Sequence, residues 1–395
     1  NTAGFTMTTV TEPDTSTAGT NPGYNCGTNA VYTVQSGVTE VGVYVWGAGG
    51  SGAGSAYPTS HGGGGGGFSS GNLAVTAGQS LKIIAGEGGA RNSGSVGRAF
   101  FRGGVGAPTP NSGNGGGLSI VHTGCIPSYP VPTGFVPSIY MIAGSGGGGA
   151  SDWGGSGGGL QGDAAKIQTE QTNNNGNGGE PADFQSGGGG DQEQGGQGGS
   201  ANGSQTANSG ELLIGGDGVA PDPQPKMGSG GGAGYYGGGG GTAHPQGFGG
   251  GGGGSAYIGH PQITSGATEE GGANGSPLTR EGGGTASPLY VSCGPGNPVG
   301  NGEGGFGPTN PDYFAGGDGY VVITASSAAS TTSTTLISTS FSAGSVPTTS
   351  RIVVFEENVA TPTLNTDIIA SISRDGGSTF TTATLSDSGY VTGSS

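Results

Sequence analysis

The chain has 395 residues, 100 of them glycine and 23 proline, and its 25 acidic and 9 basic residues give a net charge of −16. These few, scattered lysines and arginines exclude nucleic acid as a partner, since its binding needs clustered cations. No apolar stretch reaches the roughly 18 residues of a membrane-spanning helix, which excludes membrane insertion. Only 9% of residues are charged and 30% are hydrophobic, so the chain also lacks the composition of a highly charged disordered protein.

Residues 1–37 are rich in Thr, Ser, Asn and Pro and are interpreted as an extended N-terminal arm. No signal-peptide pattern is present, and the start at Asn1 predicts a chain trimmed from a secretory precursor or during particle maturation. The disulfide candidates Cys26, Cys125 and Cys293 lie far apart, without the CxxC spacing of a metal or redox site. They predict one disulfide plus a spare thiol, or an intermolecular bridge, in an extracellular setting. All three pairings remain open.

Residues 38–324 are predicted to form a glycine-rich β domain. Val41, Val43 and Val45 alternate with Gly42, Tyr44 and Trp46, which indicates a strand with one buried face. Residues 73–85 predict a β-hairpin around a turn at Ala77-Gly78-Gln79. Further strands are expected over residues 118–121, 138–143, 255–258 and 320–324. No window has the periodicity of an amphipathic helix, so the predicted fold class is all-β.

Residues 325–350 form a Ser/Thr-rich linker, and glycine is much rarer after it. Residues 351–395 predict a small C-terminal β-module with strands at 352–355, 366–373 and 380–385 and a turn at 374–377. The chain stops at Gly393-Ser394-Ser395 without a closing strand, so this module is expected to be incomplete.

Glycine blocks at 62–67, 237–241 and 249–254 adjoin strand sequence. Polyglycine can adopt the polyproline II conformation, with three residues per turn, about 3.1 Å rise and no internal hydrogen bonds. Neighbouring segments must then bond to one another laterally, which predicts a hexagonal bundle. Ordering costs about 1–2 kcal/mol per residue and a hydrogen bond returns about 0.5–1.5 kcal/mol, so the bundle needs support from strands at its ends and from neighbouring subunits.

Aromatic residues lie within or beside the glycine blocks, where a ring could lie flat on a backbone that carries no side chains. They are interpreted as residues that cap the bundle. The alternative is that they are isolated anchors in flexible loops. The six are Phe68, Trp153, Tyr235, Tyr236, Phe248 and Tyr257.

Two resemblances follow from these motifs. Residues 38–50, 62–68, 73–89, 139–149, 249–258 and 317–323 together resemble the glycine-rich domain of the ectodomains of the anaplastic lymphoma kinase family and of viral surface proteins. This implies a jelly-roll-like sandwich with an inserted polyglycine II helix bundle; no kinase or transmembrane segment follows, so the receptor role is not carried over. The tail, at residues 351–357, 364–367 and 371–380, is similar to a β-module of structural and tail-fibre proteins of aquatic tailed phages.

Other motifs do not predict chemistry. The GxGxxG pattern at residues 47–52 follows a strand, but residues 55–67 cannot start the helix that a dinucleotide site requires. The four histidines, His61, His122, His244 and His260, have no nearby cysteine or patterned carboxylate pair, and 215–218 and 316–319 are interpreted as turns rather than calcium repeats. We therefore predict no catalytic, cofactor or metal site. Asn202 and Asn274 match the glycosylation pattern, for which chance is an equal explanation.

The sequence thus predicts a non-enzymatic structural subunit of an extracellular filament or of a virion-surface or tail fibre. It would assemble with copies of itself through its terminal arms, residues 1–37 and 325–395, by adding a strand to a neighbour's sheet edge. The alternative is an adhesin that binds a cell-surface receptor or glycan through loops between glycine blocks, such as 161–194 and 244–248.

Overall fold

The structure is a computed structural model, and two compact units, Asn1–Ser330 and Thr331–Ser395, divide the chain. Among the described residues nearly all regular elements are antiparallel strands, so the all-β class is confirmed, and η1 (Thr133–Ser138) is the single short helix found there. No helix in the described part of the chain has the length and apolar character needed to cross a membrane. The described residues are 5–10, 30–53, 62–90, 103–107, 112–126, 130–165, 186–201, 205–219, 228–244, 247–272, 282–290, 302–305, 315–326, 335–340, 344–345, 347–349, 351–354, 363–387 and 389.

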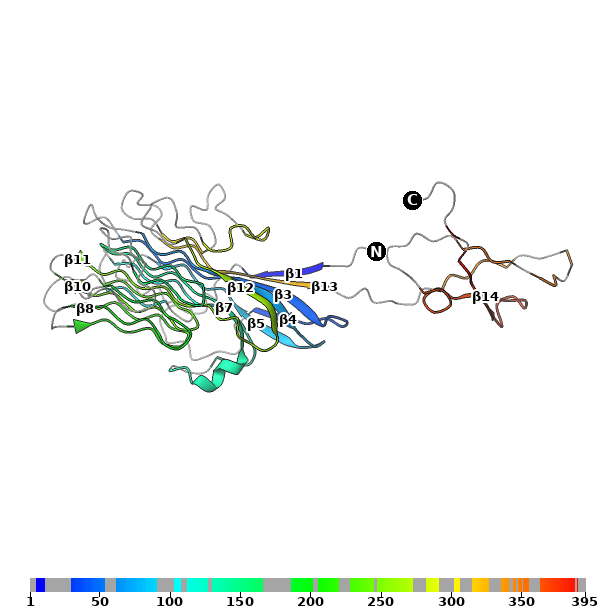
Figure 1. Cartoon of the computed structure of the whole chain (residues 1–395), viewed down its shortest axis with the longest axis horizontal. Coiled ribbons are helices and arrows are strands. Elements are labelled where there is room, and N and C mark those ends of the chain that lie inside the picture. The colour runs from blue at the N-terminus through cyan, green and yellow to red at the C-terminus, as the bar shows by residue number, and fades with distance from the viewer. Residues whose placement is uncertain are drawn as a thin grey trace. The chain divides into compact units, whose positions relative to one another are not determined.

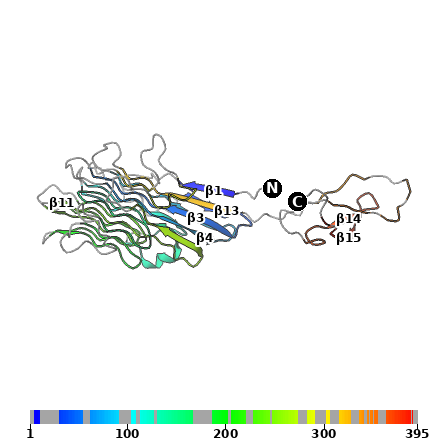
Figure 2. The same cartoon turned by 45° about the horizontal axis from the view of Figure 1, so that its top comes forward.

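Two antiparallel sheets form one end of the first unit (Figures 1 and 2). The larger has the order β1-β13-β3-β4-β12 and the smaller has the order β2-β5-β6-β7. The strands of the larger sheet are β1 (Phe5–Val10), β3 (Glu40–Trp46), β4 (Phe68–Ala74), β12 (Ile263–Glu269) and β13 (Tyr320–Ser326). Those of the smaller sheet are β2 (Ala30–Thr33), β5 (Ser80–Ile84), β6 (Ser119–His122) and β7 (Ile139–Ala143).

The main hydrophobic core lies between these sheets. Val41, Val43 and Val45 of β3 are buried in one cluster with Ile323 of the neighbouring strand β13 and Met141 of β7 in the other sheet. The residues between the valines are half-buried, so the alternation predicted for this strand is confirmed. Because a strand turns alternate side chains to opposite faces, the period-two sequence places these valines in the sandwich core.

The predicted hairpin over residues 73–85 is wrong in its pairing. The turn is present, with Gly78 at φ +81° and a hydrogen bond from Gln79 N to Thr76 O of 3.0 Å. However, β4 pairs with β3 and β12, whereas β5 pairs with β2 and β6. The turn therefore connects the two sheets instead of closing a hairpin, because the core between the sheets buries both strands.

Three other expectations differ from the structure. Residues 255–258 make only an isolated bridge, from Tyr257 to Ile142, and not a strand. The strand β12 is not among the predicted strands, and it pairs with β4 with a register shift between Thr264 and Ala267. The predicted N-terminal arm is not wholly free of the sandwich: β1 pairs with β13 and β2 pairs with β5.

Beyond the sheets, extended segments run side by side to the other end of the unit (Figure 1). We call these segments the glycine bundle. Short hairpins lie at the end farther from the sandwich: β8 (Ser200–Ala201) with β9 (Gln205–Thr206), and β10 (Ala243–His244) with β11 (Gly247–Phe248). The described residues of the bundle are 47–53, 62–67, 86–90, 103–107, 112–117, 144–165, 186–199, 207–219, 228–242, 249–256, 302–305 and 315–319.

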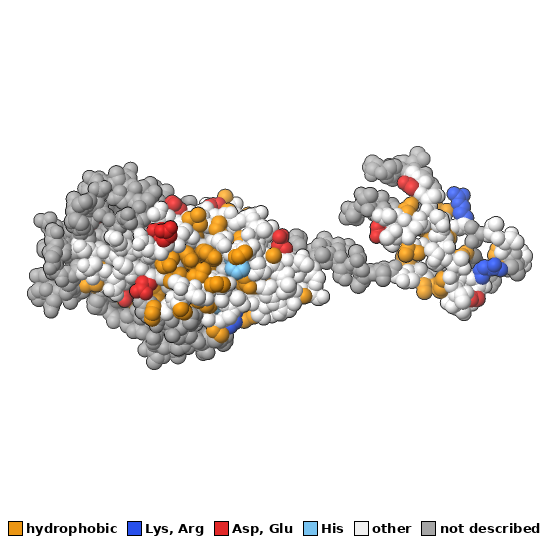
Figure 3. Space-filling view, turned by 60° about the horizontal axis from the view of Figure 1, so that its bottom comes forward, with side chains coloured by type: hydrophobic (Ala, Val, Ile, Leu, Met, Phe, Trp, Pro, Cys, Tyr) orange, Lys and Arg blue, Asp and Glu red, His pale blue; other side chains and the backbone are white. Residues whose placement is uncertain are grey.

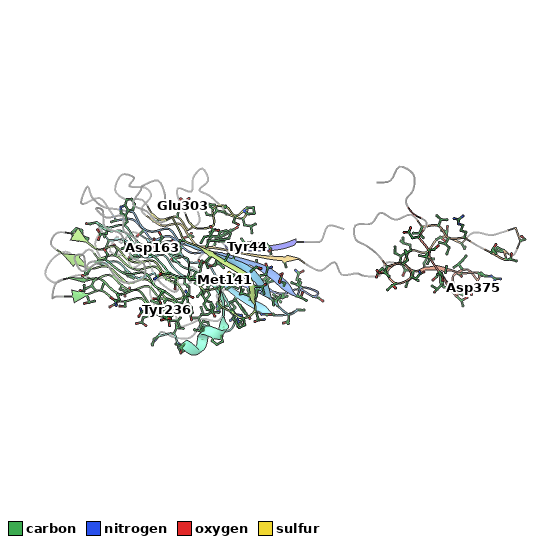
Figure 4. The ribbon with its side chains drawn as sticks, in the orientation of Figure 1. Tyr44, Met141, Asp163, Tyr236, Glu303 and Asp375 are labelled. Atoms are coloured by element: carbon green, nitrogen blue, oxygen red, sulfur yellow. The ribbon has the colours of Figure 1, made fainter. Side chains whose placement is uncertain are left out.

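The second unit contains one described pair of strands, β14 (Ala370–Ile372) and β15 (Thr381–Ala383). They lie within two of the predicted strands, 366–373 and 380–385. The third predicted strand is 352–355, and its described residues 352–354 are not in a strand. Asp375 organises the predicted turn: its carboxylate accepts hydrogen bonds from Thr379 Oγ1 (2.6 Å), Ser373 Oγ (2.8 Å) and the Thr379 amide (2.8 Å). These bonds, those of Thr379 first, lower the pKa of this exposed carboxyl (labelled in Figure 4).

Candidate functional site: the glycine bundle and its aromatic margin

The block Gly249–Gly254 shows how the bundle is held together. Its glycines are all buried, and every third residue bonds to the same neighbouring segment. The donor–acceptor pairs, from N to O, are Gly251 to Gly148 and Gly254 to Ser145 (both 2.9 Å), Gly249 to Thr242 and Gly252 to Gly239 (both 2.9 Å), and Gly253 to Asp163 (2.8 Å). Residues three apart therefore face one neighbour, and the residues between them face others.

The carbonyls of this block repeat the pattern with further segments. The amides that donate to them are Gly155 to Gly251 (2.9 Å), Gly158 to Gly254 (3.1 Å), Ser229 to Gly249 (3.1 Å), Gly232 to Gly252 (2.8 Å), Gly187 to Gly250 (2.9 Å) and Gly190 to Gly253 (3.0 Å). The segments that accept from this block and those that donate to it are six different stretches of chain, which surround Gly249–Gly254. In these carbonyl pairs the residue numbers rise together, so the neighbours run parallel, whereas the segments at 145–148 and 239–242 run antiparallel.

A second block, Gly62–Gly67, has the same period. Its donor pairs are Gly63 to Gly305 (3.0 Å) and Gly66 to Gly302 (2.7 Å), and Gly64 to Gly147 (2.9 Å) and Gly67 to Gly144 (2.8 Å). Segments 144–149 thus lie against both blocks. The repeat of three residues is a property of the bundle and not of one loop.

Close approach between backbones explains why these positions are glycine. A Cβ added to Gly252 would meet the carbonyl oxygen of Gly188, and one added to Gly254 would meet that of Ala233, both inside the 3.0 Å that real Cβ contacts respect. None of the glycines in 249–254 has a positive φ. Glycine is therefore required here by lack of space rather than by an unusual backbone conformation.

Small residues enter the bundle where a hydroxyl can join the backbone bonding. The buried Ser145 hydroxyl donates to Gly117 O (2.6 Å) and accepts from the Ala48 amide (3.3 Å). Ser229 Oγ similarly donates to Gly149 O (2.7 Å) and accepts from the Gly113 amide (3.1 Å). These serines are not among the predicted site residues, although their isolated positions inside glycine-rich runs distinguish them in the sequence.

Three of the predicted capping aromatics meet at one margin of the bundle. The rings of Tyr235 and Tyr257 stack with centroids 4.5 Å apart, and Tyr235 contacts Tyr236 edge-on at 5.1 Å. All three are half-buried against a cluster that includes Ile142 and Leu212. Burial raises the pKa of Tyr235 and of Tyr257. Figure 4 places Tyr236 and Asp163 among the extended segments and Met141 at the strands.

Phe68 belongs to a different cluster, at the point where strands become glycine segments. Its ring lies 4.7 Å from that of Trp46, which in turn lies 5.5 Å from Tyr320. Trp46 is fully buried, and its Nε1 has no hydrogen-bond partner in the part of the chain that the structure describes. Trp46 and Tyr320 are not among the predicted capping residues, although Trp46 directly precedes and Tyr320 directly follows a glycine.

Trp153 and Phe248 belong to neither aromatic cluster. Both are half-buried, and Phe248 O accepts a hydrogen bond from the Asp152 amide (3.2 Å). The structure therefore brings together three of the six predicted capping residues. Whether they cap the bundle stays a prediction.

The cysteines and asparagines singled out earlier are mostly outside the described residues. Cys26, Cys293, Asn202 and Asn274 lie outside them. Cys125 is described and is disulfide-bonded. The pairing, the spare thiol and glycosylation remain predictions.

The described histidines do not form a polar centre. His122 is fully buried, its ring lies 6.1 Å from that of Phe135, and burial lowers its pKa to about 4. His260 lies edge-on to Tyr140 at 4.7 Å. His61 and the side chain of His244 fall outside the described part. Among described residues, no group of three His, Cys, Asp or Glu side chains could hold a metal ion.

Two Asp-Gly motifs connect segments of the bundle. Asp217 Oδ1 accepts a hydrogen bond from the Val105 amide (2.8 Å), and Asp318 Oδ1 accepts one from the Gly88 amide (2.8 Å). Desolvation raises the pKa of Asp318, and desolvation together with the Asp318 charge raises that of Glu87. These aspartates are thus bonded to the backbone of distant segments.

Comparison with known proteins adds no relative. The chain matches no protein-family model and no curated protein. The described bundle is a body held together by backbone hydrogen bonds, and the polar side chains buried in it are mostly serines.

Proposed function

We propose that this chain is a non-enzymatic structural subunit of an extracellular filament or of a virion-surface or tail fibre. The observation that carries the proposal is the lateral bonding of the glycine blocks, in which each block is bonded on several sides. Bonding in many directions resists bending and denies a protease an extended single strand. Such a body suits a stiff segment of a fibre.

The finer fold assignment belongs to the same proposal. A three-residue repeat, neighbours in both directions and six surrounding stretches are what packed polyproline II helices require, so they support a polyglycine II bundle. Two sheets around a shared core are compatible with a jelly-roll-like sandwich. The resemblances to the glycine-rich ectodomain family and to the phage β-module remain proposals, as does the extracellular or virion location, for which the disulfide at Cys125 is supporting evidence.

A second candidate function is an adhesin for a cell-surface receptor or glycan. It is favoured by the short hairpins β8–β9 and β10–β11, which lie together at the end of the bundle away from the sandwich (Figure 1). Loops displayed on a rigid scaffold commonly bind ligands. Glycan-array binding that disappears when residues 243–248 are scrambled would favour this candidate.

Electron microscopy of the purified chain over a range of concentrations tests the first candidate. The proposal expects ordered, end-to-end assemblies that become more frequent as concentration rises. Single particles at every concentration would contradict self-assembly. Resistance of the assembled and unassembled chain to proteinase K, mapped by mass spectrometry, tests the stiffness of the bundle separately.

A further inference from the structure

The second unit, Thr331–Ser395, has no core of its own among its described residues. None of them is buried, whereas all three hydrophobic clusters lie in the first unit. Its two described strands, β14 and β15, have three residues each. A two-stranded hairpin by itself is marginally stable at best in water, so this unit needs additional packing.

The second unit exposes several large apolar side chains to solvent. It carries six of the eight exposed large hydrophobic residues among the described residues, and Figure 3 shows apolar side chains at its surface. Single exposed apolar residues are ordinary, but a concentration of them marks an interaction site. With their exposed fractions, the six are Leu336 (90%), Ile337 (70%), Val353 (57%), Val354 (51%), Ile369 (62%) and Phe380 (50%).

The available area suits a stable association. The six residues expose between half and nine-tenths of their surface, so together they offer a substantial part of the about 800 Å² that each partner contributes to a standard interface. The residues come from four separate stretches of chain rather than from one. That distribution resembles a core divided between chains, as in obligate oligomers, more than a compact docking patch.

The hairpin of the unit allows a second copy of the same unit to bind. The unit has two basic residues, Arg351 and Arg374, against five acidic ones, Glu356, Glu357, Asp367, Asp375 and Asp387. The apolar side chains, and not the charges, therefore favour this association. Identical hairpins can also pair edge to edge about a two-fold axis, which closes the interface.

We propose that residues 331–395 complete their core by packing against the same unit of a second copy of this chain. This inference rests on the proposed function, because it names the partner and the segment through which subunits join. The described apolar side chains, led by Ile369 and Val353, become the buried centre of that interface.

Sedimentation velocity of the full chain, over a dilution series, tests the proposal with the double variant Val353→Ser/Ile369→Ser. Both positions are exposed in a single copy, so the fold of one chain should tolerate the change, and an unaltered far-ultraviolet circular dichroism spectrum would establish this. The matched control is Leu160→Ser, which replaces a residue that is 50% exposed on the first unit. We expect the wild type and the control to associate equally and the double variant to associate at least 10-fold more weakly.

Three results would overturn the inference, and they can be distinguished from one another. Association that is equally strong in the double variant would place the contact elsewhere and leave the proposed function standing. A wild-type chain that stays monomeric at all concentrations would remove both this inference and self-assembly. A monomeric chain that binds a different protein through Val353 and Ile369 would also contradict the proposal that the partner is a second copy of this chain.

Discussion

Replacing Gly252 by alanine tests the packing of the glycine bundle at the block Gly249–Gly254. The Gly252 amide donates to Gly239 O (2.9 Å) and its carbonyl accepts from the Gly232 amide (2.8 Å). The new methyl group would meet Gly188 O at a distance that real side chains do not reach. Because the obstacle is backbone rather than a movable side chain, the segments must separate.

The expected loss follows from these contacts. Weakening two bonds costs about 0.5–1.5 kcal/mol each, and about 1–3 kcal/mol for each group left buried without a partner. Alanine offsets about 0.4–1 kcal/mol by restricting the unfolded chain. We therefore expect Gly252→Ala to lower the free energy of unfolding by about 2–4 kcal/mol.

Denaturant unfolding followed by tryptophan fluorescence measures this change, since Trp46 is fully buried. The control is Gly134→Ala in η1, where nothing lies within 4 Å of the new Cβ. That variant should match the wild type or be slightly more stable. Equal midpoints for Gly252→Ala and Gly134→Ala would refute the argument that backbone contact dictates glycine in the bundle.

Three further predictions concern other parts of the first unit. Ser145→Ala removes a donor to Gly117 O and an acceptor for the Ala48 amide, and it should lower the free energy of unfolding by about 1–3 kcal/mol. The control is Ser80→Ala, at an exposed position, which should leave the melting temperature unchanged. Equal melting temperatures for the two variants would contradict this prediction. Burial lowers the pKa of His122 from 6.5 to about 4. As the pH falls below 6.5, the unfolded chain therefore binds the proton before the folded chain does. The free energy of unfolding should then decrease by up to roughly 3 kcal/mol between pH 6.5 and pH 4. In His122→Gln the unfolding midpoint should vary less between pH 4 and 6.5, and an unchanged slope would argue against it. Deleting residues 1–10 removes β1 and leaves β13 as a sheet edge, so light scattering should detect more self-association than in the wild type; no increase would mean that β1 does not protect that edge.

The sandwich was largely predictable because its strands carry strong local signals. The alternation around Val43 and the apolar runs of β7 and β13 are typical of buried strands. Which strands pair with one another was harder to predict. The turn at Gly78 has the residues of an ordinary hairpin turn, and only the core shared by the two sheets shows that this turn connects them. β12 was missed because Gly266 and Ser265, the latter at φ +53°, interrupt any regular alternation.

The bundle was predictable as a type of packing but not in its connections. A glycine block carries no side-chain pattern, so the sequence cannot say that Gly252 bonds to Gly239 or that residues 144–149 lie between two blocks. The aromatic residues illustrate the same limit. Tyr235, Tyr236 and Tyr257 share a margin because distant segments meet there, while Phe68 joins Trp46 through strand pairing.

Amide hydrogen exchange of residues 144–149, 228–242 and 249–254 tests the central claim most directly. Most of these amides donate to carbonyls on neighbouring segments, and all of these residues except Tyr235 and Tyr236 are buried, so the account predicts protection comparable to that of β3 and β13 in the sandwich. Exchange at the rate of an unfolded chain in these glycines, with β3 and β13 still protected, would contradict it.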